Sequence, residues 1–231
     1  MRETLERGFA ALGLSPDGIP SLLRYADLLL ETNRVMNLTA ITEPKDVASL
    51  HFLDSLELLT LADFSGKSVI DVGTGAGFPG LPLRIADPSI RLTLLDALDK
   101  RVGFLQAVCE ELNLPDVTCV HARAEEYAAG HREYFDLAVS RAVANLQVLC
   151  ELTLPLVKVG GWFLAMKSVE CGRELADAEA AIRTLGGAPA VVRDYTIPGT
   201  EIVHRLLLIQ KIRETPAKYP RIFAKIKKNP L

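Results

Sequence analysis

An apolar strand that runs directly into a glycine-rich loop is the feature that most constrains the fold of this chain. The segment reads Val69-Ile70-Asp71-Val72-Gly73-Thr74-Gly75-Ala76-Gly77-Phe78-Pro79-Gly80. Glycine lacks a Cβ atom, so such a loop can adopt positive φ and let a ligand lie against bare backbone. The helix that follows offers unpaired N–H groups to a carboxylate or a phosphate. The junction therefore predicts a nucleotide-type cofactor site.

A second apolar strand ends at an acid with the spacing that a doubly wound sheet requires. Residues 92–95 lead to Asp96, which lies 23 residues beyond Gly73. In such folds this position holds the acid that accepts hydrogen bonds from the hydroxyl groups of a bound ribose. The loop and the acid together indicate a ligand that carries a sugar.

Two types of ligand compete for this geometry. Dinucleotides need G-x-G-x-x-G directly after the strand, but a motif that starts at Gly73 has Phe78 in its sixth position. A frame that starts at Gly75 and ends at Gly80 fits, although it begins two residues late. The pattern acid-x-Gly-x-Gly-x-Gly fits from Asp71 without a shift, and it resembles the cofactor loop of class I S-adenosylmethionine methyltransferases. A glycine-rich turn that binds no ligand remains a third interpretation.

The hydrophobic pattern divides the chain into three parts. Residues 1–62 carry leucines at helical spacing and predict an N-terminal helical cap. Residues 63–213 alternate between strands (near 68–72, 91–95, 117–121, 135–140 and 161–167) and helices (near 79–87, 98–112, 145–155 and 170–185), and they end in two strands near 189–196 and 202–211. We expect an α/β class I methyltransferase fold, Rossmann-like, with a mostly parallel seven-stranded sheet and an antiparallel edge hairpin. Residues 214–231 form a basic C-terminal tail.

Charge is distributed unevenly along the chain. The formal net charge of the 231 residues is −3, which argues against a nonspecific nucleic-acid coat protein. From Lys211 onward, however, seven lysines and arginines stand against the single acid Glu214. A basic tail on an acidic body indicates contact with a polyanion, and the alternative is a solvated, disordered end.

The four cysteines show no C-x-x-C pair and no metal-ligand spacing with the histidines. We therefore expect buried thiols in a reducing compartment. No apolar stretch is long enough to span a bilayer, and the first residues do not resemble a signal peptide. The sequence thus predicts a cytoplasmic protein, which we expect to be a monomer.

The residues after the fourth strand narrow the type of reaction. Methylases of exocyclic amines usually carry an Asn/Asp-Pro-Pro-aromatic turn there, and cytosine-C5 enzymes need a cysteine nucleophile. This chain has Ser140-Arg141-Ala142-Val143 instead, and Cys150 lies inside an expected helix. An acceptor that already presents a lone pair, such as guanine N7, needs neither device. Transfer to N7 also needs no general base.

Several motifs resemble, in order and nearly end to end, a family of bacterial guanine-N7 methyltransferases of small-subunit ribosomal RNA, the glucose-inhibited division protein B family. They are Asn33-x-x-x-Asn37-Leu38-Thr39, His51-x-x-Asp54-Ser55, residues 71–82, Leu95-Asp96 with Lys100-Arg101, Arg123-Ala124-Glu125, Ser140-Arg141-Ala142 and Lys218-Tyr219-Pro220-Arg221. The chain departs from the family at Ala97, where serine is common, and at His121, where glycine is usual. The resemblance implies S-adenosylmethionine as methyl donor and a guanine of 16S ribosomal RNA, or of the small ribosomal subunit, as acceptor.

The resemblance also implies site residues. The residues expected to bind the cofactor are Gly73, Thr74, Gly75, Gly77 and Phe78 at the methionine end, Asp96 at the ribose, Ala97, Arg123, Ala124 and Glu125 near the adenine, and Arg141. The residues expected to position the substrate are Asn37, His51, Asp54, Ser55 and again Arg141. The phosphate-binding candidates are Lys100, Arg101, Lys167, Lys218 and Arg221.

His51 and Asp54 are three residues apart and share a helix face, but no third ligand completes a metal site, so no metal is expected. Three other classes of function stay open: a nicotinamide-dependent oxidoreductase, a methyltransferase of small molecules and a noncatalytic RNA-binding module. Affinity for the two cofactors distinguishes the first class, and dependence on the basic tail distinguishes the second.

Overall fold

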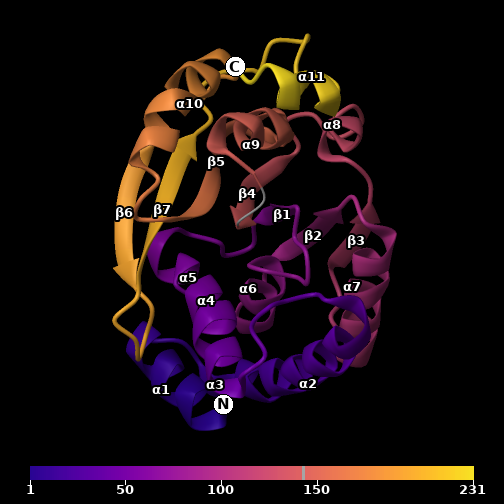
Figure 1. Cartoon of the computed structure of the whole chain (residues 1–231), viewed down its shortest axis with the longest axis vertical. Helices are drawn as coiled ribbons and strands as arrows, with labels where there is room; N and C mark the ends of the chain where they lie inside the picture. Colours follow the sequence, from indigo (N-terminus) through magenta and orange to yellow (C-terminus); the bar gives the residue numbers. More distant parts are fainter. Residues whose placement is uncertain (142–143) are drawn as a thin grey trace.

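The structure is a computed structural model that describes residues 1–141 and 144–231 (Figure 1). Ala142 and Val143 of the predicted motif after the fourth strand lie outside the described residues. In chain order the elements are α1 (Arg2–Leu12), η1 (Pro16–Gly18), α2 (Ile19–Met36), α3 (Pro44–Asp46), η2 (Val47–Leu53), α4 (Asp54–Leu56), α5 (Leu58–Leu61), β1 (Ser68–Val72), α6 (Gly80–Ala86), β2 (Arg91–Asp96), α7 (Asp99–Glu111), β3 (Val117–His121), α8 (Ala124–Tyr127), β4 (Phe135–Arg141), α9 (Leu146–Thr153), η3 (Leu154–Leu156), β5 (Val157–Ser168), α10 (Gly172–Thr184), β6 (Val191–Thr196), β7 (Val203–Gln210) and α11 (Phe223–Lys228).

The described strands form one seven-stranded sheet in the order β3-β2-β1-β4-β5-β7-β6. Strands β1 to β5 pair in parallel, whereas β7 runs antiparallel to β5 and β6 runs antiparallel to β7. The predicted mostly parallel sheet with an antiparallel edge hairpin is therefore confirmed. The strand order reverses between β1 and β4, and ligands of such sheets bind at the carboxyl ends of the strands beside this switch point.

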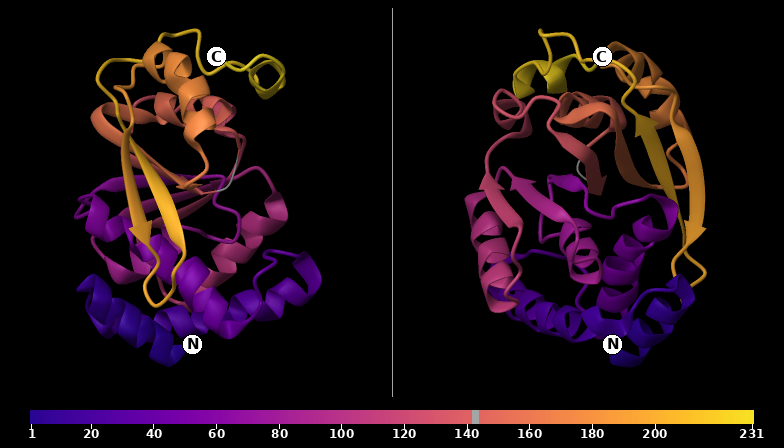
Figure 2. Two further views of the ribbon diagram at one scale, coloured as in Figure 1. Left: turned by 60° about the vertical axis from the view of Figure 1, so that its left-hand side comes forward. Right: turned by 180° about the vertical axis from the view of Figure 1, so that it is seen from behind.

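Helices cover both faces of the sheet, as the two further views show (Figure 2). Successive side chains of a strand point to opposite faces, so each strand contributes to two hydrophobic clusters. In β4, Leu137 and Val139 join the cluster that also holds the N-terminal helices, α6 and α7. Ala138 joins the opposite cluster, which contains residues of α9 and α10, and so does Phe135, which lies before a register shift in β4. The helical cap thus shares one core with the sheet, while the division at residues 62 and 213 stays a prediction.

Two elements differ from the sequence-based expectation. Strand β5 begins at Val157 rather than near residue 161, because Gly160 (φ 90°) and Gly161 carry the strand through a bulge instead of starting it. A Cβ atom at Gly161 would lie 2.4 Å from the carbonyl oxygen of Asp136. Helix η2 is a π-helix, a rare form that the leucine pattern does not signal and that often occurs at functional sites.

The basic tail is folded onto the sheet domain. Tyr219 and Ile226 are buried, and Ile226 packs against Val148 and Leu152 of α9. The first residue counted with the tail charges, Lys211, is also fully buried, and its Nζ atom donates to the carbonyl oxygens of Leu154 and Val157. Only the remaining basic residues of this segment are therefore available to a polyanion.

All four cysteines are free thiols. Cys150 and Cys171 are buried as expected, but Cys109 and Cys119 are only half-buried, and their sulfur atoms lie 3.9 Å apart. Within residues 1–141 and 144–231, no helix has the length and hydropathy needed to cross a membrane.

Candidate active site

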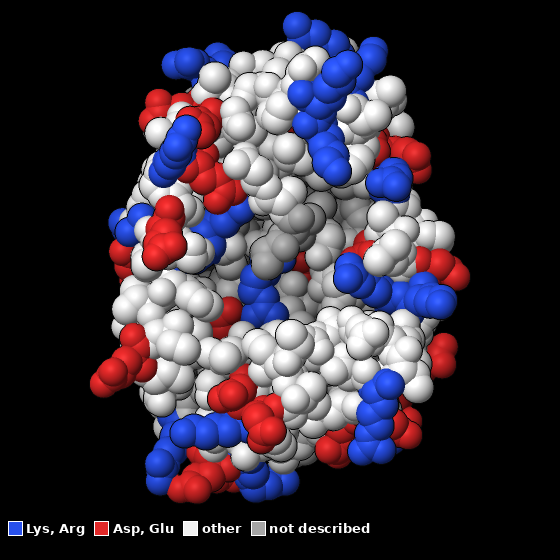
Figure 3. Space-filling view, in the orientation of Figure 1, with Lys and Arg blue, Asp and Glu red and all other residues white. Residues whose placement is uncertain are grey.

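A cavity of about 920 Å³ lies at the carboxyl ends of the parallel strands, where the strand order places a ligand. This face of the molecule is hollowed near its centre (Figure 3). The volume is at the upper end of the range of about 300 to 1,000 Å³ for ligand sites, so a cofactor and a second group can share it. The residues that line the cavity are Leu38, Thr39, Ile41, Leu50, His51, Asp54, Gly73, Thr74, Gly75, Ala76, Phe78, Asp96, Ala97, Leu98, Arg101, Arg141, Met166, Lys167, Ser168, Ile202 and His204.

The glycine loop between β1 and α6 has the conformation that its sequence predicts. Gly73, Gly75 and Gly77 have φ values of 71°, 61° and 107°. A Cβ atom at Gly77 would lie 2.6 Å from the side chains of Leu81 and Tyr25, whereas one at Gly75 would meet nothing within 4 Å. Gly77 is thus needed for packing. Gly75 leaves bare backbone exposed to the cavity, where a ligand can lie against it.

Asp71 holds the two ends of this loop together. Its Oδ2 atom accepts hydrogen bonds from the hydroxyl of Thr74 (2.7 Å) and from the backbone N–H of Gly80 (2.8 Å). Burial raises the pKa of this carboxyl to about 7. Because the N–H of Gly80 is already bonded to Asp71, it does not point at a pyrophosphate. The shifted dinucleotide motif that ends at Gly80 therefore loses its structural support.

Asp96 connects the end of β2 to the glycine loop. Its Oδ2 atom accepts from the N–H of Gly75 and its Oδ1 atom accepts from the N–H of Leu98, both at 2.9 Å. The side chain of Arg101 lies 3.5 Å from Oδ2. A carboxylate has about four lone-pair sites, so Asp96 retains acceptor capacity for the hydroxyl groups of a ribose. The bare loop and this acid fit a nucleoside-containing cofactor.

The other residues predicted near an adenine divide into two groups. Ala97 lines the cavity with Leu98. Arg123 lies at the N-cap of α8, Ala124 and Glu125 form the first turn of that helix, and none of the three lines the cavity. Arg123 instead places its guanidinium over the ring of Phe223 from the tail, 5.4 Å from the ring centre. Gly77 also lies outside the lining.

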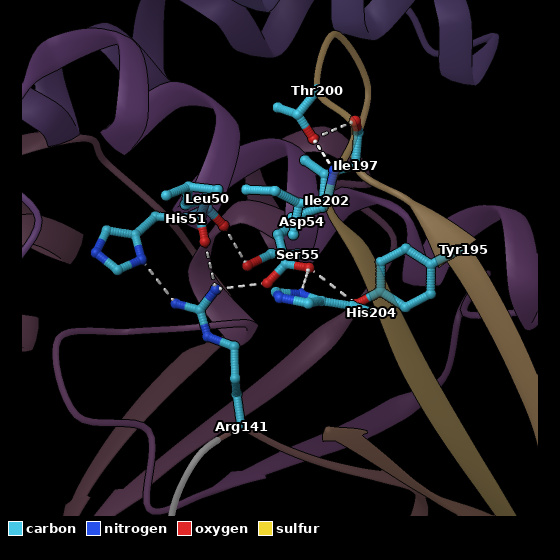
Figure 4. A network of polar contacts seen from close by, with 10 residues as sticks. All are labelled: Leu50, His51, Asp54, Ser55, Arg141, Tyr195, Ile197, Thr200, Ile202 and His204. Atoms are coloured by element: carbon cyan, nitrogen blue, oxygen red, sulfur yellow. Dashed lines mark hydrogen bonds and ion pairs between the residues drawn. The ribbon is translucent and has the colours of Figure 1, made fainter. Parts of the chain in front are cut away.

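Arg141 ends β4 and is fixed by three acceptors from the cap (Figure 4). Its Nη1 atom donates to the carbonyl oxygen of Leu50 and to Oδ2 of Asp54, and its Nη2 atom donates to Nδ1 of His51, each at 3.0 Å. The guanidinium also lies 4.9 Å from the ring centre of Phe78. All three acceptors come from η2 and the first residue of α4. The π-helix and the residue that follows it therefore present a carbonyl, an imidazole and a carboxylate to one guanidinium.

His51 is held in one protonation state. Burial, followed by the charge of Arg141, lowers its pKa to about 3, so the ring is neutral at physiological pH. Nδ1 accepts from Arg141, and we therefore assign the proton to Nε2, which lies 2.8 Å from Oγ1 of Thr39. The ring stacks on Phe78 with 4.4 Å between centroids. Asn33 in turn fixes Thr39 through hydrogen bonds to both backbone groups of that residue.

Asp54 is 1% exposed and is surrounded by donors. Its Oδ1 atom accepts from the hydroxyl of Tyr195 (2.9 Å) and from Nδ1 of His204 (2.8 Å), opposite the ion pair with Arg141. Burial alone would raise the pKa of Asp54, but the hydrogen bond from His204 and the charge of Arg141 hold it below its usual value. The same hydrogen bond raises the pKa of His204. Asp54 is therefore an ionised carboxylate that links the cap to the edge hairpin.

Tyr195 and His204 were not among the predicted site residues. They face each other across β6 and β7, which lie at the edge of the sheet and far from any motif. The one signal in the sequence is the presence of Tyr195 and His204 in a hairpin that also carries other polar residues, such as Arg193 and Asp194. That pattern is too weak to distinguish a site from a solvated edge.

Two predicted wall residues lie elsewhere. Asn37 is exposed and ends α2 in the left-handed conformation (φ 49°) that asparagine tolerates at a helix end. Ser55 is fully buried and donates to the carbonyl oxygen of His51 one helical turn earlier. Neither residue lines the cavity, so the prediction that they form a polar wall above the cofactor is corrected. Ser55 supports the backbone at His51 instead.

Cys150 is fully buried in α9, and burial raises the pKa of its thiol well above the usual value. It does not line the cavity, so it is a packing residue, as the sequence indicates. Ser140 is also buried and donates to the carbonyl oxygen of Val72. The described lining therefore presents no cysteine nucleophile to a substrate.

Comparison with known proteins identifies the family. Residues 18–203 match the family described as rRNA small subunit methyltransferase G. A relative from Alkaliphilus oremlandii, named Ribosomal RNA small subunit methyltransferase G, is 48% identical over 236 residues, which cover 100% of this chain and 99% of the relative. The chain belongs to the rRNA small subunit methyltransferase G family. A relative of the same name from Acetivibrio thermocellus is 42% identical and covers 100% of this chain and 97% of its own length.

Solved structures agree with the fold. An O-methyltransferase from Bacillus cereus in complex with SAH has a TM-score of 0.57 at 18% identity and covers 81% of this chain and 91% of its own. TYW2 from M. jannaschii in complex with AdoMet has a TM-score of 0.54 at 12% identity and covers 69% and 75%. At these identities the likeness concerns the fold, and the predicted class I methyltransferase fold is confirmed.

The predicted phosphate-binding residues of this family member differ in their surroundings. Lys100 and Lys218 are exposed, and Arg101 lines the cavity with 39% of its side chain exposed. The Nζ atom of Lys167 donates hydrogen bonds to Glu174 and to the carbonyl oxygen of Ala144. The fifth candidate, Arg221, forms a two-pronged ion pair with Glu151, which is fully buried. The last two cations therefore have structural partners.

Proposed function

We propose that the chain transfers a methyl group from S-adenosylmethionine to N7 of a guanine in 16S ribosomal RNA, by direct in-line displacement and without a covalent enzyme intermediate. Membership of the rRNA small subunit methyltransferase G family carries this proposal. The cavity supports it, because bare glycine backbone and an acid with spare acceptor capacity lie side by side in it. We expect the protein to act as a monomer in the cytoplasm.

The cofactor supplies a methyl group on a sulfonium, which is already activated for transfer. The residues of the chain hold it: the glycine loop would contact the methionine end, Asp96 the ribose, and Ala97 the base. Arg123, Ala124 and Glu125 would approach the adenine only from the edge of the cavity, since they lie outside its lining. The end of β2 would thus hold the adenosine, and the loop after β1 would hold the methionine end.

The remaining part of the cavity would receive the guanine. It extends over β4, β5 and β7, the next strands in the sheet, and Arg141, Met166 and His204 line it. N7 of guanine carries a lone pair, so the protein need not remove a proton before attack. Alignment of N7 with the methyl group is then the main contribution, because held geometry replaces a chance encounter.

Ribosomal RNA must bring its guanine out of any helix, since the major groove of A-form RNA hides N7. Basic residues around the cavity would fix the flanking phosphates. Lys100, Arg101 and Lys218 remain candidates for this role. Lys225, Lys227 and Lys228 join them, because α11 exposes all three. Lys167 and Arg221 are less suited, since each already holds a carboxylate.

Transfer of a labelled methyl group tests the proposal. Purified protein is incubated with labelled S-adenosylmethionine and, in turn, naked 16S RNA, a partly assembled particle and the mature small subunit. We expect one labelled guanine in at least one of them, and chemical cleavage at 7-methylguanine locates it. Calorimetry with S-adenosylmethionine and with NAD serves as the control for the cofactor. Tight NAD binding, or label on a base other than guanine, would contradict the proposal.

A further inference from the structure

His204 and Asp54 have the arrangement of a catalytic base and its orienting carboxylate. Nδ1 of His204 lies 2.8 Å from Oδ1 of Asp54, which is ionised and can only accept, so Nδ1 carries the proton. In the neutral ring Nε2 then has a free lone pair. The ring is one-third exposed and lines the cavity. A His–Asp pair that accepts protons has three features: a buried carboxylate, a fixed tautomer of the imidazole, and a second ring nitrogen that faces a cavity.

The strand register places this pair on the substrate side of the cavity. His204 is the cross-strand neighbour of Ser168 in β5 and of Tyr195 in β6. From β1, where the glycine loop begins, to β7 there are three strand intervals, about 14 Å in all. A purine whose N7 edge meets a methyl group over β1 and β4 extends its opposite edge, with N1 and N2, toward β7.

The two cations that line this side of the cavity already have hydrogen-bond partners. Arg141 donates to Leu50, His51 and Asp54, and Lys167 donates to Ala144 and Glu174. The described residues, by contrast, place no hydrogen-bond partner at Nε2 of His204. The ring is therefore the group of this set that is available to a base.

Methylation at N7 makes the purine cationic, and its N1–H becomes a stronger acid. An acceptor at N1 therefore bonds more strongly in the transition state than in the ground state, which is the condition for acceleration. A cation at this place would oppose the developing charge. A neutral imidazole that donates to a buried carboxylate stabilises the positive charge that develops on the purine.

We propose that Nε2 of His204, supported by Asp54, accepts the N1 proton of the target guanine as N7 is methylated. The N7–CH3 bond forms as the S–CH3 bond breaks, and the N1–H electron pair neutralises the ring. The proton passes to His204, whose imidazolium pairs with Asp54 and later releases it to water. This inference rests on the proposed function, because it requires a guanine as acceptor.

The charged and titratable groups around His204 determine how kcat should depend on pH. Asp54 faces it from α4, Arg141 lies beyond Asp54 at the end of β4, and Tyr195 faces it from β6, with its ring edge-on at 6.2 Å. The hydrogen bond to Asp54 raises the pKa of His204. Since the acceptor must be neutral, kcat should rise with pH through this raised pKa.

His204→Asn separates a chemical role from a structural one. The asparagine amide can still donate to Asp54 from the position of Nδ1, but it has no distal nitrogen. We expect kcat to fall about 100-fold, as for loss of a general base, with the affinity for S-adenosylmethionine unchanged. The rising limb of the pH profile should disappear. His131→Asn, at a ring that stacks on Tyr127 outside the cavity, is the matched control and should behave as wild type.

Altered RNA tests the contact directly. With 1-methylguanosine at the target, wild-type kcat should fall and His204→Asn should lower it no further, whereas inosine, which keeps N1–H, should behave as guanosine. Without cofactor, the NMR signal of the His204 ring should shift with guanosine RNA and not with 1-methylguanosine RNA. Wild-type kcat and pH profile in His204→Asn would overturn this inference alone. A wild-type chain that methylates no guanine would overturn the proposed function, and this inference with it.

Discussion

The two halves of the cavity are built in opposite ways. Over β1 and β2, the contacts join residues close in sequence: Thr74 to Asp71 across 3 positions and Gly75 to Asp96 across 21. Over β4 and β7, Arg141 and His204 reach Asp54 across 87 and 150 positions. In the first half, carboxylates accept from a hydroxyl and from backbone N–H groups, whereas in the second a carboxylate accepts from a guanidinium and an imidazole.

This difference fits the ligands that the two halves would bind. A cofactor that is the same in every methyltransferase of this fold can be bound by backbone and one acid, which change little with the surrounding sequence. An acceptor that differs between methyltransferases must be recognised by side chains. On the proposed function, Arg141 of β4 is joined in this role by side chains from the cap and the edge hairpin, which lie outside the repeated βα units. Mutations should therefore affect either binding of the cofactor or recognition of the acceptor.

Arg141→Ala should have the largest effect and should fall on the substrate half. We expect methylation of small-subunit RNA to drop to background, while affinity for S-adenosylmethionine falls less than about tenfold. Because Asp54 loses its ion-pair partner, the free energy of unfolding should also fall by about 3 kcal/mol. Labelled methyl transfer, calorimetry and urea unfolding measure the three quantities. Arg2→Ala on exposed α1 is the control, and transfer by Arg141→Ala at the wild-type rate would break the comparison.

Asp96→Ala should act on the cofactor half. Loss of the acceptor for the ribose and of its bonds to Gly75 and Leu98 should weaken S-adenosylmethionine binding by about 30- to 100-fold, equivalent to about 2 to 3 kcal/mol. Calorimetry measures the binding. Asp99→Ala, whose side chain is 85% exposed, is the matched control. Equal affinity in the two variants would show that the acid does not hold the cofactor.

Asp71→Asn should change the pH dependence of stability. The pKa of this buried carboxyl is raised to about 7, so the folded protein keeps a proton that the unfolded chain loses above its ordinary pKa. Asp71 therefore costs the wild type stability as pH rises from about 4 to 7, by at most about 1.4 kcal/mol per pH unit. The variant lacks this loss. Urea unfolding of both proteins across that range should give diverging curves, and parallel curves would contradict the protonation of Asp71.

Replacement of Lys225, Lys227 and Lys228 by Gln should have the smallest effect. RNA affinity should fall, and the slope of log K against log salt should decrease by about 0.7 to 0.9 for each phosphate that the variant no longer neutralises. Binding of S-adenosylmethionine should not change. Lys67 and Lys158, exchanged for Gln as a pair, are the control, because they ion-pair with Asp63 and Asp136 away from the tail. Removing residues 211–231 is a poorer test, since Lys211 and Ile226 are buried.

The cofactor half and the sheet could be predicted because their signals are local. Positive φ at Gly73, Gly75 and Gly77 follows from glycine itself, and the distance to Asp96 follows from one βα unit. Motifs in the sequence point to His51, Asp54 and Arg141, but not to the contacts between them. Nothing in their spacing shows that a π-helix brings His51 and Asp54 to the guanidinium of Arg141. Lys167 and Arg221 illustrate the same limit: the sequence shows a cation, but not the carboxylate that it already holds.

By itself the sequence determined the order of strands and helices, the bare-backbone loop and the acid one strand away, since these depend on periodicity and on the chemistry of single residues. Only the tertiary structure decided that Tyr195 and His204 both bond to Asp54, and that Asn37 and Ser55 do not line the cavity. The reason is physical. A buried carboxylate such as Asp54 requires donors from whatever segments pack around it, and that packing is set by the whole core.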